Sequence, residues 1–385
     1  MENAIAIIDE IKTPLNEVES YNNFIQLYNC FAPRVWLEPE ILFELCNYIA
    51  RNRPELVDLG TRINVQVNLY LRSIANYHTN PNNILDMRNN IGCFALTESK
   101  AGVLSGLVVD VKFEETEDGY ILNSGDVCKR WISQGMLANK SLVVASNKMN
   151  HRDCRIFSVD MEEQGVMRYR MNNIPVSKIL DLAEIQYDNV KLHKSAVLDK
   201  TIPLSRKELL TGIFYGRLCL AEVVMNSISE FVSTVHEKVK DIEKFKKLGH
   251  FEYISNLNYN LNGYCQRMIE RRQSLLNTKD VMRINCYKAY CVEQAIYIYN
   301  KIHMMFGTHA FGFGLDYQTL ILNKVAEGDT SVLKLACIKQ HLDNCGVRSL
   351  KCKHWVGMFC NPVKYIMTNS DEIFDEIVAT YIDLL

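Results

Sequence analysis

The spacing of apolar residues along the chain changes twice, and each change predicts a different kind of structure. In the first 90 residues apolar side chains recur every three or four positions, as in 11–31 and 39–52, and Pro33 and Pro54 interrupt the pattern. This interval places apolar side chains on one face of an α-helix. We therefore expect residues 1–90 to form an N-terminal helical domain.

The pattern between residues 91 and 200 is typical of β-strands. Short stretches rich in Val, Ile and Tyr, such as 119–127, 140–147 and 154–161, are separated by Gly, Asn and Asp. Apolar runs of this length, bounded by turn residues, predict a compact antiparallel β domain in the middle of the chain.

The helical interval returns at about residue 201 and lasts to residue 385. Two long amphipathic stretches, 207–245 and 281–306, lie in this part. At roughly 150 residues per domain, a chain of 385 residues has room for two or three domains. The order helical, β, helical predicts an α+β protein with three domains, 1–90, 91–200 and 201–385.

Charge and composition exclude several classes of protein. Lys and Arg number 43 against 45 Asp and Glu, so the formal charge is −2 and binding of nucleic acid through bulk charge is not expected. No run approaches the ~18 uncharged apolar residues of a membrane span. The acidic N-terminal stretch lacks the features of a secretory or mitochondrial signal, and the last residues are not a peroxisomal address. We expect a cytoplasmic protein.

The chain has 13 cysteines, which should be reduced thiols in that compartment. One group, Cys345, Cys352, His354 and Cys360, has the spacing C-x6-C-x-H-x5-C. Structural zinc sites usually supply ligands in pairs two to four residues apart. We therefore favour ordinary cysteines and no metal, with a zinc protein built on this group as a minor alternative.

The first motif that suggests chemistry starts the β region. Residues 92–102, GCFALTESKAG, run from an apolar strand into Thr97, Glu98 and Ser99 and then a small-residue turn. Such a turn offers N–H groups and a hydroxyl to a phosphate or a planar polar ligand. Taken alone, a strand followed by an ordinary polar loop explains the motif better.

The second motif is KRWISQG, residues 129–135. Trp131 and Ser133 would place an aromatic ring and a hydroxyl against a flat heterocycle. The ordinary alternative is a Trp in the core of the β domain, which is the common position of this residue.

The late helical region holds two more motifs. Residues 307–314, GTHAFGFG, allow a close backbone approach beside aromatic side chains, although a glycine-rich helix end would have the same sequence. Residues 325–333, VAEGDTSVL, begin an amphipathic helix near Glu327. Locally, Asp-Thr-Ser is good N-cap chemistry, and an acidic residue at a helix N-terminus favours the helix dipole.

Together, and in this order, the motifs resemble the acyl-CoA oxidase and acyl-CoA dehydrogenase superfamily. The matching segments are FALTES-x-x-G (94–102) and KRWISQG (129–135) for the two flavin-contacting loops, YDNVKL (187–192) for the strand closing the β domain, GRLCLAEVV (216–224) for the start of the C-terminal helices, and EGDTSVL (327–333) for the segment with the catalytic glutamate. The amino-acid sequences of the motifs are closer to those of the oxidases, and the chain length is closer to that of the dehydrogenases.

The resemblance covers residues from about 90 to about 345 and implies an N-terminal helical domain, a middle β domain and a C-terminal four-helix-bundle domain. It implies FAD as the cofactor and an acyl-CoA substrate oxidised between its α and β carbons. It also implies a homodimer or homotetramer. The implied site residues are Glu327 as the base that removes the α proton, with Thr97, Ser99, Trp131, Ser133 and Thr330 holding the flavin.

Three positions depart from the family pattern. Ala326 precedes the glutamate where an aromatic residue is usual, Lys100 lies in the flavin loop where a small residue is usual, and Phe245 stands where an arginine usually meets the flavin pyrophosphate. A lysine near Phe245 lacks the bidentate geometry of arginine. The alternative function is therefore a catalytically inactive member that keeps the fold as a binding or self-assembling scaffold.

Overall fold

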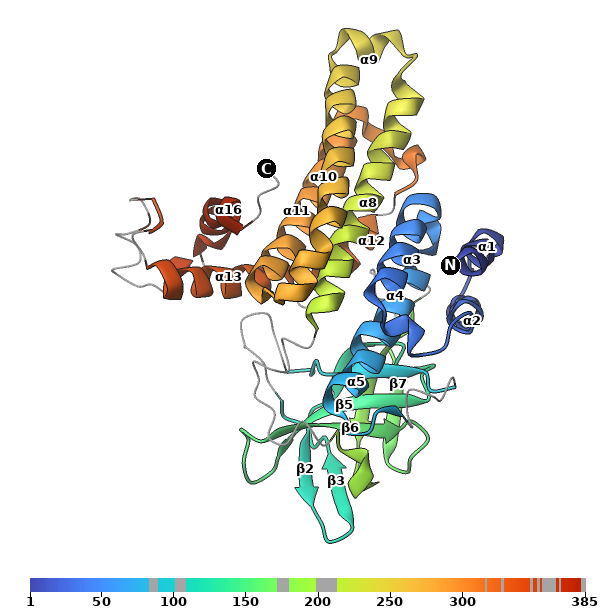
Figure 1. The fold of residues 1–385 in the computed structure, drawn as a ribbon, viewed down its shortest axis with the longest axis vertical. Helices are drawn as coiled ribbons and strands as arrows, with labels where there is room; N and C mark the ends of the chain where they lie inside the picture. Colours follow the sequence, from blue (N-terminus) through green and yellow to red (C-terminus); the bar gives the residue numbers. More distant parts are fainter. Residues whose placement is uncertain are drawn as a thin grey trace. The chain divides into compact units, whose positions relative to one another are not determined.

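The computed structural model describes most of the chain and divides it into two compact units. The described residues are 1–82, 89–100, 109–171, 180–198, 213–315, 317–326, 329–346, 349–351, 354, 365–366 and 368–381. One unit comprises Met1–Ile49 and Glu55–Gly216, and the other comprises Ala50–Pro54 and Arg217–Leu385. The structure is a mixed α+β fold with helices, then strands, then helices, as predicted (Figure 1).

The N-terminal part of the first unit is helical, as its apolar spacing predicts. Asn16 caps the second helix, because its side chain accepts a hydrogen bond from the Glu19 N–H at 3.0 Å. Trp36 stacks on Tyr28 and fills the core between the helices. The elements are α1 (Glu2–Glu10), α2 (Glu17–Tyr28), η1 (Val35–Leu37), α3 (Pro39–Asn52), η2 (Pro54–Leu56), α4 (Val57–Asn64), the π-helical η3 (Val65–Leu71) and α5 (Arg72–Tyr77).

The β-strands form two sheets whose apolar faces share one core. In the first sheet the order is β1-β5-β2-β3-β9, with β6 also paired to β5, and in the second it is β4-β8-β7. Buried side chains from both sheets form one cluster, which includes Phe113, Ile132 and Phe157. The strands are β1 (Gly92–Ala95), β2 (Lys112–Glu115), β3 (Gly119–Asn123), β4 (Lys129–Ser133), β5 (Lys140–Asn147), β6 (Cys154–Asp160), β7 (Val166–Arg170), β8 (Leu182–Tyr187) and β9 (Val190–His193).

The prediction of a purely antiparallel β domain needs one correction. β1 and β2 both pair with β5 in parallel, with Gly92 opposite Lys140 and Lys112 opposite Ser146, while the other strand pairs are antiparallel. Parallel neighbours require a long connection, and β5 follows β1 only after three intervening strands. Strand periodicity does not report which strands become neighbours.

Gly92 allows the helical part and β1 to approach closely. A Cβ at this position would lie 2.0 Å from the Tyr70 ring, so a side chain there would collide with η3. The Gly92 N–H donates to Gln66 Oε1 at 2.8 Å. The strand that leads into Thr97 is thus anchored to a helical segment at its first residue.

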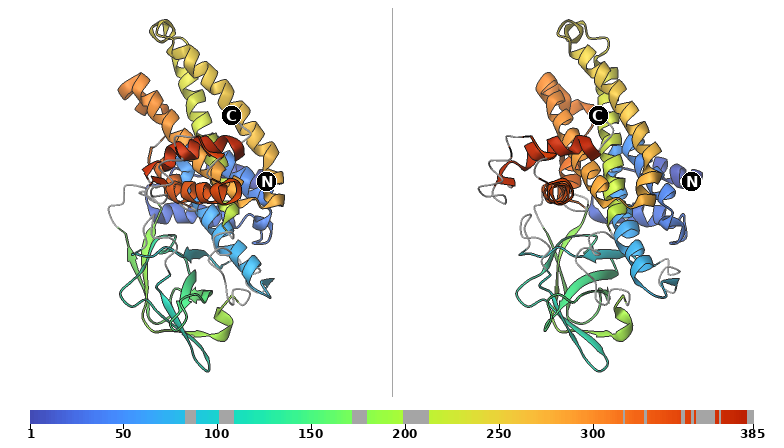
Figure 2. Two further views of the ribbon diagram at one scale, coloured as in Figure 1. Left: turned by 90° about the vertical axis from the view of Figure 1, so that its left-hand side faces the viewer. Right: turned by 60° about the vertical axis from the view of Figure 1, so that its left-hand side comes forward.

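The second unit is built of long helices. α8 (Phe214–Val239), α10 (His250–Thr278) and α11 (Val281–Phe306) run side by side in both figures (Figures 1 and 2). Arg272 of α10 and Glu222 of α8 form a buried bidentate pair at 2.8 and 2.6 Å. The remaining elements are α9 (Glu243–Lys247), η6 (Gly307–Phe313), α12 (Tyr317–Val325), α13 (Thr330–Cys345) and α16 (Ser370–Tyr381).

One described helix, α8, is long and apolar enough by length and composition alone to cross a bilayer. In the structure 78% of its most apolar stretch is buried, and a core helix passes the same test.

Candidate functional site

The first two sequence motifs lie side by side in the β domain. Glu98 and Lys129 form an antiparallel β-bridge. The Ser99 N–H donates to the Cys128 carbonyl at 2.9 Å, and the Arg130 N–H donates to the Thr97 carbonyl at 2.8 Å. The fold therefore brings Thr97 and Ser99 next to the strand that carries Trp131 and Ser133.

Trp131 has an unusual backbone conformation and an exposed ring. Its φ is +64°, in the left-handed region that bulky residues rarely adopt, and the residue is 50% exposed. The pairing of β4 with β8 shifts register between Lys129 and Ile132, which is the mark of a bulge. The alternative of a core tryptophan is therefore wrong, because the bulge turns the ring outward.

Arg130 lies beside the Trp131 ring and is itself paired with Glu184. The Arg130 guanidinium carbon lies 5.5 Å from the centre of the Trp131 ring, and Arg130 Nε is 2.7 Å from Glu184 Oε1. An aromatic face flanked by a guanidinium is suited to a flat, anionic or electron-rich ligand.

The three hydroxyl residues of these motifs differ in exposure and in hydrogen bonding. Thr97 is exposed, whereas Ser99 and Ser133 are half-buried. Ser99 Oγ accepts a hydrogen bond from the Cys128 N–H at 3.2 Å, so it helps to hold the two segments together. Ser133 ends β4 opposite Leu182.

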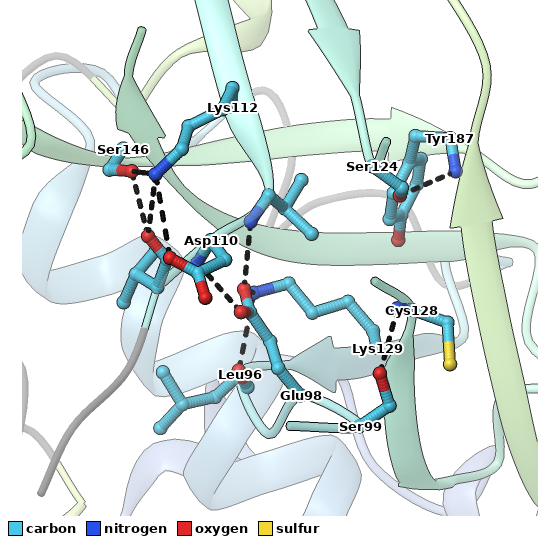
Figure 3. A network of polar contacts seen from close by, with 12 residues as sticks. Leu96, Glu98, Ser99, Asp110, Lys112, Ser124, Cys128, Lys129, Ser146 and Tyr187 are labelled. Atoms are coloured by element: carbon cyan, nitrogen blue, oxygen red, sulfur yellow. Dashed lines mark hydrogen bonds and ion pairs between the residues drawn. The ribbon is translucent and has the colours of Figure 1, made fainter. Parts of the chain in front are cut away.

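A fully buried ion pair lies beneath these residues and was missed by the sequence analysis. Lys129 Nζ is 2.6 Å from Glu98 Oε1, and neither side chain is exposed (Figure 3). Burial lowers the pKa of Lys129, and the Glu98 carboxylate opposes that effect. Charged residues inside two apolar strand motifs were the available signal, because buried charges require partners.

A cavity of about 350 Å³ lies beside the same segments. It is lined by Lys100, Asp110, Lys112, Glu114, Asn123, Ser124, Gly125, Asp126, Val127 and Lys148. Lys100 Nζ is 2.5 Å from Asp126 Oδ2, and this contact lowers the pKa of the Asp126 carboxyl. The three lysines face three carboxylates, so the lining is balanced in charge and favours neither anions nor cations.

One predicted site residue of the second unit, Thr330, is described, and it lies at the start of α13. Asp329 caps this helix by accepting a hydrogen bond from the Ser331 N–H at 2.8 Å, which confirms the predicted N-cap chemistry. Thr330 is the first helical residue and is fully buried, and its Oγ1 has no hydrogen-bond partner within the described part of the chain. Glu327 lies outside the described residues.

Comparison with known proteins identifies the architecture. No protein-family model and no curated protein matches the sequence. A solved glutaryl-CoA dehydrogenase from Mycobacterium smegmatis in complex with FADH2 has a TM-score of 0.61 and 20% sequence identity over 88% of this chain and 97% of that chain. An acyl-CoA dehydrogenase from Geobacillus kaustophilus has a TM-score of 0.68 and 17% identity over 88% and 96%. PigA with FAD and proline has a TM-score of 0.69 and 14% identity over 88% and 92%.

The chain has the acyl-CoA dehydrogenase fold. This confirms the predicted order of an N-terminal helical part, a middle β domain and a C-terminal helical part. Similarity at these identities concerns the fold, and the site has to be judged on its own residues.

In this acyl-CoA dehydrogenase fold the position where the resemblance implies an arginine is packed with aromatic rings. The Phe245 ring centre lies 4.9 Å from that of Phe306 and 6.1 Å from that of His250. Phe245 therefore serves packing within the helical unit.

The late cysteine group is only partly described. Cys345 is exposed at the end of α13, and Cys352 and Cys360 lie outside the described residues. His354 is buried, with Nδ1 3.1 Å from Tyr365 Oη and Nε2 3.4 Å from Glu376 Oε2. Among the described residues no group of three or more His, Cys, Asp or Glu side chains is arranged to hold a metal ion.

Proposed function

We propose that this chain is a flavoprotein that binds FAD and oxidises the bond between the α and β carbons of an acyl-CoA thioester. The observation that carries the proposal is the exposed Trp131 ring, held at positive φ next to Thr97 in an acyl-CoA dehydrogenase fold. Backbone strain of this kind persists where the surrounding structure imposes it, often at ligand sites. Two similar solved structures hold FADH2 or FAD.

The described residues fit such a cofactor. The Trp131 ring offers a face for the flavin ring, and two residues offer hydroxyls: Thr97, which follows β1, and Ser133, the last residue of β4. In the other unit, Thr330 Oγ1 is buried without a described partner, and its proposed contact with the flavin rests on the motif resemblance. Ser99 contributes indirectly, because its hydroxyl is engaged with the Cys128 N–H.

In the proposed mechanism Glu327 removes the α proton of the thioester. The flavin would accept the hydride from the β carbon. A carboxylate that acts on so weak an acid must lie within hydrogen-bond reach of the proton, and an apolar surrounding makes it a stronger base. The motif sequences resemble those of the oxidases and so favour oxygen as the electron acceptor over a partner flavoprotein. We propose a homodimer or homotetramer as the assembly.

The test is the visible absorption spectrum of the purified protein before and after the addition of FAD. We expect the two-band flavin spectrum, its bleaching by an acyl-CoA, and peroxide in air if oxygen is the acceptor. Bleaching without peroxide would indicate a dehydrogenase. A colourless protein that takes up no FAD would refute the proposed function.

A second candidate function is a non-catalytic scaffold, and the observation that favours it is Phe245. Its ring is part of an aromatic cluster at the position where an arginine would meet the flavin pyrophosphate. A scaffold predicts no FAD uptake together with a defined oligomer in light scattering. The same purified sample therefore separates the two functions.

A further inference from the structure

We infer that the buried pair of Glu98 and Lys129 positions the Trp131 ring for its flat ligand by fastening a distant backbone segment to the start of β4. The inference rests on the proposed function only in naming that ligand as FAD. The two charged atoms are 2.6 Å apart, and neither side chain is exposed. Removal of two charges from water is costly, so a buried pair is a poor device for stability alone.

The Glu98 carboxylate holds more than the lysine. Its Oε2 accepts a hydrogen bond from the Asp110 N–H at 2.6 Å, and its Oε1 accepts one from the Val111 N–H at 3.1 Å (Figure 3). These bonds join positions that are 12 and 13 residues apart in the chain. A carboxylate that accepts several N–H bonds is fixed in orientation, so Glu98 positions the two residues that lead into β2.

Lys129, in the motif 129–135, connects the Glu98 carboxylate to the end of β1. Its Nζ also donates to the Leu96 carbonyl at 3.2 Å, so one ammonium group links the end of β1 to Glu98. Lys129 is the first residue of β4 and lies two positions before Trp131. The pair therefore ties the Leu96 carbonyl and the Asp110 and Val111 N–H groups to Lys129, the residue after which the pairing of β4 with β8 shifts register.

The conformation of Trp131 requires such a support. A bulky residue at a φ of +64° is held there by its surroundings. Half of the residue is exposed, so ring packing supplies only part of that constraint. The Arg130 N–H bond to Thr97, the pairing of Ile132 with β8 and the buried Glu98–Lys129 pair contribute the remaining constraint.

The test measures Trp131 directly, without a cofactor. The chain has three tryptophans, so 5-fluorotryptophan labelling gives three ¹⁹F resonances, and Trp131→Phe identifies the relevant one. In Glu98→Gln/Lys129→Met no unpaired charge is left buried. We expect this variant to fold, with the Trp131 resonance shifted or broadened and that of the buried Trp36 unchanged.

Two further variants keep the test decisive. Glu98→Asp retains both charges but shortens the carboxylate by one methylene, and it should move the Trp131 resonance in a folded protein. Glu114→Gln breaks the exposed pair with Lys148 in the same domain and should leave the resonance in place. A Trp131 resonance that stays at the wild-type position in folded Glu98→Asp and in the double variant would overturn the inference.

The FAD arm separates this inference from the proposed function. If wild-type protein binds FAD, the double variant should bind it about tenfold to a hundredfold more weakly, while Glu114→Gln binds normally. Unchanged FAD affinity in the double variant counts against the positioning role. A wild-type protein that binds no FAD refutes the proposed function, and the ¹⁹F result still decides whether the pair positions Trp131.

Discussion

Arg62 and Asp181 form an ion pair in which both side chains are fully buried and Arg62 Nη1 lies 2.7 Å from Asp181 Oδ1. Arg62 belongs to α4, and Asp181 immediately precedes β8. Arg62 Nε also donates to Ser20 Oγ at 2.9 Å, and Asp181 Oδ2 accepts from the Met136 N–H at 3.0 Å. This pair joins the N-terminal helices to the turn that follows β4, so it contributes to the support of the candidate site.

Loss of one partner of the Arg62–Asp181 pair should destabilise the protein strongly. Arg62→Met leaves the Asp181 charge buried without its cation, so we expect the free energy of unfolding to fall by about 3–5 kcal/mol. Arg62→Met/Asp181→Asn should recover part of that loss, since no charge remains buried. Urea denaturation measures both values.

The matched control is Lys140→Met. Lys140 pairs with Asp160 at 2.8 Å, but both side chains are partly exposed. Its loss should cost about 1 kcal/mol or less. An equal cost for the Arg62 and Lys140 variants would contradict the assigned role of the buried pair.

Trp131 should show opposite effects on stability and on binding. Trp131→Gly relieves the positive φ, so we expect the free energy of unfolding to stay level or rise by about 1 kcal/mol. FAD affinity should fall about tenfold or more, because the aromatic face is lost. Titration of FAD against each protein, followed by flavin fluorescence, measures the affinity. A Trp131→Gly protein that binds FAD normally would show that the ring does not contact the cofactor.

Substitution of Glu327 should slow turnover and leave cofactor binding intact. An amide cannot accept the α proton, so Glu327→Gln should lower kcat by about 10²- to 10⁴-fold while the bound-flavin spectrum persists. Asp343→Asn, at an exposed position of α13, is the control and should keep its activity. Full activity in Glu327→Gln would assign the base to another residue.

Because of His341, we expect the folded protein to lose stability in mild acid. Its Nδ1 lies 2.9 Å from Tyr381 Oη and its Nε2 lies 2.8 Å from Ser349 Oγ, and burial lowers the pKa of its imidazole while Glu376 opposes that shift. The unfolded chain therefore binds the extra proton, so the free energy of unfolding should fall as pH decreases below about 6.5. Burial lowers the pKa of His303 in the same direction.

Urea denaturation at about pH 7.5 and about pH 5.5 tests this expectation. His341→Gln should make the stability less dependent on pH over this interval, with the remaining dependence due in part to His303. The contact with Lys140 lowers the pKa of the Asp160 carboxyl, so carboxyls of this kind change the free energy of unfolding only below about pH 4. A pH dependence as steep in His341→Gln as in wild type would exclude His341 as its source.

The sequence alone was sufficient to predict the order of helical, β and helical parts. Helix and strand periodicities are local properties, so a short window of residues reports them. It was also sufficient for the N-cap at Asp329, because capping depends on the next two or three residues. The two motifs that contain Thr97 and Trp131 could be named from their residue types, since glycines, hydroxyls and an aromatic side chain stood together.

Only the tertiary structure decided how those pieces meet. Glu98 and Lys129 are 31 residues apart, and Arg62 and Asp181 are 119 residues apart, so no local pattern pairs them. The parallel pairing of β1 and β2 with β5, and the bulge that turns Trp131 outward, likewise depend on which strands pack together. Strand pairing is selected by the burial of the shared core as a whole, and that energy is a property of the folded chain and of no single segment.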